Sequence, residues 1–171
     1  DLAMKQDNFG HLNAIWSYLK KYDAAYYKWL MHIVGDCQDV SFALEWYIAW
    51  FSHCSISDFS TILRIYDFMI STQNQSIGLY MVLAVLLLNK KQIMQNVENL
   101  SDFIVFTKSG LSFDKDSVSQ LITKCHQIMQ SEMKEEQRRN SWKQNKMEAI
   151  KAWRQIRQKS KAFATIFYAS E

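Results

Sequence analysis

The sequence contains no proline and only four glycines among its 171 residues. Collagen-like, low-complexity and turn-rich β folds all need more of both residues. So few helix breakers in a chain of this length predict an all-α protein. The apolar fraction of 49%, which includes many aromatic residues, is large enough to build a sizeable core and excludes bulk disorder.

Patterns that would hold a metal or a cofactor are also missing. The three cysteines, Cys37, Cys54 and Cys125, are widely spaced and form no C-x-x-C pair, so neither a zinc knuckle nor a disulfide framework is expected. The four histidines do not recur at helical spacing, and no glycine-rich phosphate loop occurs. We therefore predict no metal site, no cofactor and no catalytic residue, and reduced thiols in a cytoplasmic setting.

The longest apolar run, residues 79–88, has ten residues. A membrane-spanning helix needs about 20. We therefore interpret this run as a buried helix of the core.

Apolar residues recur at helical spacing in several other segments. These predict helices at residues 9–33 (one long helix or two), 40–51, 59–70, 90–97, 101–106 and 118–129. Gly35 is expected to end the first region, Ser57 to cap residues 59–70 with Asp58 in the first turn, and Ser101 and either Asp116 or Ser117 to cap the last two. In residues 59–70 we expect one apolar stripe, made of Phe59, Ile62, Leu63, Tyr66 and Met69.

Two groups of side chains within this region have alternative interpretations. The aromatic cluster of Trp46, Tyr47, Trp50 and Phe51 is typical of core packing, although some of its rings could line a partner-binding face. Arg64 and Asp67 lie three residues apart, as a solvated pair or a buried polar pair would. For both groups we favour a structural role.

Charge is distributed unevenly along the chain. Residues 1–133 carry 10 basic and 13 acidic side chains, net −3, whereas residues 134–161 carry 10 basic and 3 acidic ones, net +7. We therefore predict a helical lobe at 1–133 and a basic amphipathic helix or linker at 134–171. With its stripe around Trp142 and Trp153, this segment could pack on the body as a solvated helix or bind an anionic membrane surface. Binding to nucleic acid or calmodulin is the weakest interpretation, and we expect no nucleic-acid partner.

Three segments in order resemble the TBC domain of Rab GTPase-activating proteins. The run Phe42-Ala43-Leu44-Glu45-Trp46 followed by Trp50-Phe51 resembles that family's FA-x-RW…F helix. Residues 58–67 resemble its D-V-LRLWD helix, and residues 79–94 its L…ALAIL…LL helix, so that the resemblance covers residues 22–97. Glu45 in place of Arg and Tyr66 in place of Trp are similar to the small subgroup anchored in the endoplasmic reticulum.

The resemblance implies that two catalytic side chains act in trans on a Rab-family GTPase. They are an Arg in an I-x-x-D-x-x-R motif and a Gln in a Y-x-Q motif. Neither motif occurs in this sequence, and in the family both lie upstream of the matching region. We therefore expect an activator fragment with no catalytic residue of its own, whose partner is the missing N-terminal half of the domain, before Asp1 or on another polypeptide.

These observations together predict an all-α helical bundle that forms the C-terminal half of a TBC-type domain. The lobe would support the catalytic half and supply part of the GTPase-binding surface, at the cytosolic face of the endoplasmic reticulum or Golgi in early secretory traffic. Trp46, Trp50 and Arg64 are the candidate binding residues, important mostly for architecture. The alternative is a non-catalytic helical scaffold that binds a protein, or binds an anionic membrane through its basic tail.

Overall fold

The computed structural model describes residues 3–35, 40–51, 55–56 and 58–168, and side-chain surroundings within residues 12–154 except 36–39, 45 and 52–57. The chain forms two compact units, Asp1–Met129 and Gln130–Glu171. We call the first unit the helical body. The last helix of the chain continues beyond Met129 into the second unit, and we call that part the tail helix. The division falls near residue 133, where charge asymmetry placed the boundary, and the two predicted domains stay a prediction.

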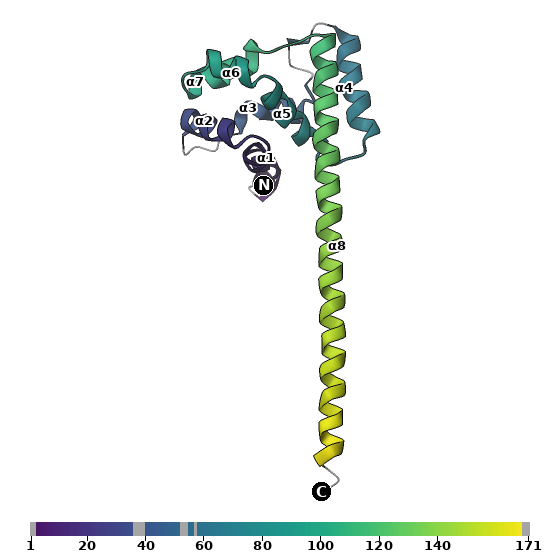
Figure 1. Cartoon of the computed structure of the whole chain (residues 1–171). Helices are drawn as coiled ribbons and strands as arrows, with labels where there is room; N and C mark the ends of the chain where they lie inside the picture. The colour runs from purple at the N-terminus through teal and green to yellow at the C-terminus, as the bar shows by residue number, and fades with distance from the viewer. Residues whose placement is uncertain (1–2, 36–39, 52–54, 57, 169–171) are drawn as a thin grey trace. The chain divides into compact units, whose positions relative to one another are not determined.

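The described residues are almost entirely helical, which confirms the all-α prediction (Figure 1). Two strands of two residues each, β1 and β2, pair in parallel, Ser55 opposite Ser112 and Ile56 opposite Phe113. In chain order the elements are α1 Ala3–Tyr22, α2 Ala24–Val34, α3 Ser41–Ile48, β1 Ser55–Ile56, α4 Phe59–Ser71, α5 Ile77–Leu88, α6 Lys90–Asn96, α7 Leu100–Val105, the π-helical turn η1 Phe106–Gly110, β2 Ser112–Phe113 and α8 Lys115–Tyr168.

Helix α5 is the centre of the body. Every side chain from Ile77 to Leu86 is buried, as expected of a helix that is apolar on all sides. Helices α1, α3 and α6 contact it. Gly78 allows a close approach, because a Cβ at this position would lie 3.1 Å from ring carbons of Tyr47. The predicted core helix is thus confirmed.

Within the described ranges, no single helix combines the length and the apolar composition needed to cross a membrane. Helices α5 and α6 meet both criteria only when counted together across a 61° bend.

The first predicted helical region is two helices rather than one. The Asp23 side chain accepts a hydrogen bond from the Tyr26 N–H at 2.9 Å and so caps the start of α2. Gly35 ends α2 as predicted, with φ of 72° and its N–H donating to the Met31 carbonyl oxygen at 2.9 Å.

Three predicted N-caps are wrong, because an Asp or Asn close by caps each helix instead. Asp58 itself caps α4, whereas Ser57 lies outside the described residues. Asn99 replaces Ser101 at α7, and Asp114 replaces Asp116 or Ser117 at α8. In each helix the short side chain accepts from an N–H three residues on, at 2.8–3.0 Å, as an N-cap requires.

Helix α3 also ends earlier than predicted. Its last residue is Ile48, whereas periodicity placed the end at Phe51. Trp50 and Phe51 adopt left-handed backbone conformations, with φ of 46° and 65°, and the Phe51 N–H donates to the Trp46 carbonyl oxygen at 3.2 Å. This turn buries Phe51 and leaves Trp50 exposed.

The buried Trp46 provides a test of the core. Its side chain is 3% exposed and contacts the rings of Phe42 and Phe51, each centroid 6.1 Å away. We expect Trp46→Ala to lower the free energy of unfolding by about 3–5 kcal/mol in urea denaturation. Trp50→Ala, at a side chain that is 41% exposed, is the control and should cost under about 1 kcal/mol. Equal losses would contradict this packing.

An ion pair ties α2 to α6 and makes stability depend on pH. The Lys90 Nζ lies 2.6 Å from Asp23 Oδ2, and this hydrogen bond, with that from the Tyr26 N–H, lowers the Asp23 pKa from its ordinary value. A lowered folded-state pKa stabilises the protein above the unfolded-state pKa, and the stabilisation is lost as pH falls through the folded value.

We therefore expect Lys90→Gln to be less stable than the parent at pH 7 and the difference to shrink in acid. Because both side chains are partly exposed, the difference should be below about 1 kcal/mol. Urea unfolding from neutral to acidic pH measures it, with Lys91→Gln on the same helix as control. A difference that does not change with pH would argue against the pair.

Candidate partner-binding surface

Ligand groups and reactive side chains can be located only in the part of the body that the structure describes. No group of three metal-ligating side chains occurs among the residues searched, which are the described ones. Burial raises the pKa of the Cys125 thiol to about 12, so this sulfur is not a nucleophile near neutral pH. Cys37, His53 and Cys54 lie outside the described residues.

A polar hollow of about 430 Å³ lies where β2 and the start of α8 meet the end of α5. Its lining includes Asn89, Gln92, Asp114 and Ser117. Hydrogen bonds from Ser117 lower the Asp114 pKa, so this carboxylate is ionised, but it serves as the cap of α8. Within this lining, Asp114 has no acidic or histidine neighbour, so the hollow offers no acid–base pair.

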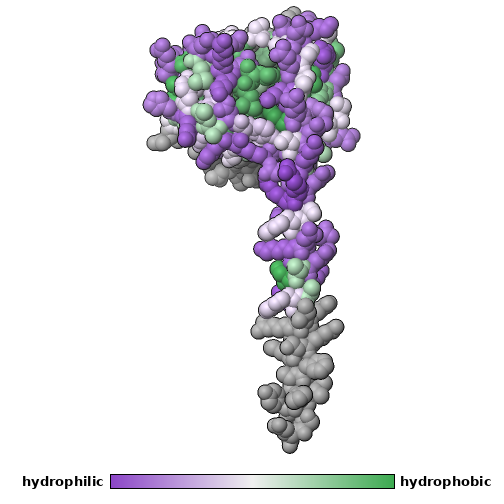
Figure 2. Space-filling view, in the orientation of Figure 1, coloured by the Kyte–Doolittle hydropathy of each residue, from purple (hydrophilic) through white to green (hydrophobic). Residues whose placement is uncertain are grey.

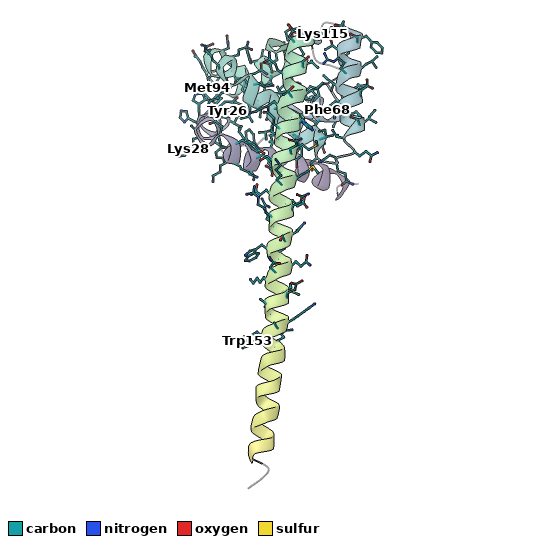
Figure 3. The ribbon with its side chains drawn as sticks, turned by 45° about the vertical axis from the view of Figure 1, so that its right-hand side comes forward. Tyr26, Lys28, Phe68, Met94, Lys115 and Trp153 are labelled. Atoms are coloured by element: carbon teal, nitrogen blue, oxygen red, sulfur yellow. The ribbon has the colours of Figure 1, made fainter. Side chains whose placement is uncertain are left out.

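Helix α4 has a buried side and a separate exposed side, and both carry apolar side chains. The inner side carries Thr61, Ile65 and Met69, which are buried. Phe68, labelled in Figure 3, also packs against the core. The predicted single stripe is therefore wrong. The buried stripe is 61, 65 and 69, and of the expected residues only Met69 is buried, whereas Phe59 and Leu63 are exposed.

The outward side forms a continuous apolar surface. Phe59, Leu63, Tyr66 and Ile70 are spaced by four, three and four residues, which places them along one side of a helix. Phe59 is 71% exposed and Ile70 is 62% exposed; Leu63 is also exposed and Tyr66 is half-buried.

Trp50 extends this surface beyond α4. Its ring meets that of Tyr66 edge to face, with centroids 5.9 Å apart. The left-handed turn after α3 thus places the exposed indole of Trp50 beside α4. We call Trp50, Phe59, Leu63, Tyr66 and Ile70 the α4 face.

The polar edge of α4 lies beside this surface. Arg64 and Asp67 are both exposed, and no ion pair joins these two described residues. The buried polar pair is therefore wrong, because both side chains reach solvent.

The three candidate binding residues occupy different environments. Trp46 is in the core and cannot contact a partner directly, whereas Trp50 belongs to the α4 face and Arg64 lies on its polar edge. Their roles in binding remain predictions. The exposure of Phe59 and Ile70 was not predicted, although a helix with apolar residues on two sides is itself a sign that both sides need partners.

Figure 2 shows one face of the body, where hydrophobic residues appear at several positions among hydrophilic ones. Isolated exposed apolar residues are normal on proteins, but a contiguous set along one helix marks an interaction site. The α4 face is such a set, so it is the candidate partner-binding surface.

Comparisons with known proteins agree with this reading of the fold. The model of the Rab-GTPase-TBC domain family matches residues 7–94, from α1 into α6, and the α4 face lies within this range. The GTPase-activating protein gyp10 of Schizosaccharomyces pombe is 33% identical over 84 residues, which are 49% of this chain and 21% of that protein. The chain therefore aligns with about a fifth of this relative's length. No solved structure matches significantly. Because the family model covers just over half of the chain, the protein belongs to the Rab-GTPase-TBC domain family.

Proposed function

We propose that this chain is the C-terminal lobe of a Rab GTPase-activating protein and that its α4 face forms part of the surface that receives the GTPase. The observation that carries the proposal is an exposed apolar helix face within the region matched by the TBC family model. Following the resemblance to the endoplasmic-reticulum-anchored subgroup, the proposed place of action is the cytosolic face of the endoplasmic reticulum or Golgi, in early secretory traffic.

The energetics of the α4 face suit a binding surface. Complete burial of an exposed Phe or Ile side chain contributes about 1.5–3 kcal/mol. Aromatic residues packed near the centre of an interface usually dominate its binding energy. Trp50 and Phe59 are placed to act in this way, with Arg64 at the edge available to an acidic group on the partner.

Catalysis in this proposal comes from outside the lobe. Acceleration of GTP hydrolysis needs a positive charge on the transferring phosphoryl group and a side chain that orients water. Arg64 belongs to α4, whose sequence resembles a structural helix of the family, so we do not assign it as an arginine finger. The other half of the domain supplies both groups, and this lobe supports it and helps to hold the GTPase.

The GTPase-binding role can be tested with surface variants. Phe59→Ser with Ile70→Ser should leave thermal unfolding nearly unchanged, since both side chains are exposed, and should weaken binding to a Rab GTPase carrying a non-hydrolysable GTP analogue by about tenfold or more. Calorimetry against a panel of Rab GTPases measures this. The matched control is Met94→Ser with Val105→Ser, two exposed apolar residues away from α4.

Hydrolysis assays test the assignment of the lobe. The chain alone should not accelerate GTP hydrolysis, whereas the chain together with a polypeptide that carries both catalytic motifs should. Acceleration by the chain alone would contradict the proposal. So would equal losses of binding in the two double variants, or a parent chain that binds no member of the panel.

A further inference from the structure

The tail helix exposes large apolar side chains and basic side chains together. All side chains from residue 136 to residue 154 are exposed, including those of Trp142 at 63% and Trp153 at 62%. Met147 and Ile150 are exposed as well. Figure 2 shows the described part of this helix as mostly hydrophilic with a short hydrophobic section, and Trp153 projects from it in Figure 3.

Helical geometry brings the two indoles to the same side. Trp142 and Trp153 are eleven residues apart, which is just over three full turns and ~16 Å along the axis. Ala149 lies on that side as well and adds only a small side chain. Lys146 stands between them, and its Nζ is 5.0 Å from the centroid of the Trp142 ring.

Exposed basic residues lie on other sides of the helix. By helical spacing, Lys143 and Arg154 lie about a quarter turn from the indoles and Lys151 lies on the opposite side. Residues 134–161 carry a net charge of +7. Lysine and arginine can extend along an apolar surface while their charged ends reach a polar layer. Tryptophan prefers the boundary between apolar and wet regions for the same reason.

An anionic lipid surface satisfies both chemistries at once. Acidic headgroups attract the basic side chains, while the region just beneath them accepts the indoles. A second copy of the tail helix would cover the apolar side chains, but two segments that each carry a net charge of +7 would repel each other. Nucleic acid would neutralise the charge but gives no apolar environment to Met147 and Ile150, which are aliphatic rather than stacking side chains.

We propose that residues 134–161 of the tail helix form an interfacial membrane-binding element. Trp142 and Trp153 insert at the headgroup boundary of an anionic membrane, and the neighbouring lysines and arginines contact lipid phosphates. This binding does not depend on recognition of a GTPase, so it goes beyond the proposed function and can fail independently of it.

The test is sedimentation of the 171-residue chain with vesicles of phosphatidylcholine, with and without phosphatidylserine. We expect binding to the anionic vesicles at about 0.05 M salt and much weaker binding at about 0.5 M, where screening shortens the reach of the charges. Neutral vesicles should bind little, because apolar insertion is only one of two required signals.

Two sets of variants separate the contributions. Trp142→Ala with Trp153→Ala should weaken partitioning by about tenfold or more, because two interfacial anchors are removed. Reversal of four charges, with Lys143, Lys146, Lys151 and Arg154 each changed to Glu, should weaken it by about 100-fold or more. Circular dichroism of each variant confirms that helix content is retained.

The matched control reverses four exposed lysines of the body, Lys20, Lys28, Lys91 and Lys115, and changes the net charge by the same amount. It should bind anionic vesicles far better than the tail reversal. Equal losses in the two reversals would overturn the proposal, as would no vesicle binding by the parent chain. Tighter binding to duplex RNA or DNA than to vesicles, or dimerisation through the tail helix, would replace it with a nucleic-acid or self-association site.

Discussion

Helix α5 presents apolar side chains in every direction, so the rest of the body must surround it. No side chain from Ile77 to Leu86 reaches solvent to more than a small extent. Removal of that surface from water is the main favourable term available to a body of this size. Helices α1, α3 and α6 contact α5 directly, and the absence of a side chain at Gly78 lets the Tyr47 ring approach closely. The need to cover α5 therefore constrains where the helices around it can lie.

The turn after α3 connects this core to the surface. Left-handed backbone at two residues with bulky side chains costs about 1–3 kcal/mol each, so something must hold the turn in place. Phe51 does so, since its buried ring stacks on Trp46 and meets Phe113 edge to face. The next residue back, Trp50, is thereby fixed against Tyr66. The buried Phe51 thus positions the exposed Trp50, and the packing of the core holds this part of the α4 face in place.

Composition and periodicity predicted the helical class, the buried helix at 79–88 and the end of α2 at Gly35, because burial and chain breaking leave local marks. The caps were missed because Asp58, Asn99 and Asp114 compete with nearby serines, and only the backbone conformation decides which side chain reaches the free N–H groups. The side of α4 that faces the core was missed because both sides are apolar, so tertiary packing rather than pattern makes the choice.

The reactivity of the Cys125 thiol can report local opening of the body. Its Sγ lies 4.0 Å from the Ile77 carbonyl oxygen, at the seam between α8 and the start of α5, and its side chain is fully buried. A thiol reagent cannot reach this sulfur until the seam opens, and burial keeps it protonated until then. The rate at which this one sulfur is modified, compared with that of an unfolded chain, therefore reports how often α8 leaves α5, without any engineered label.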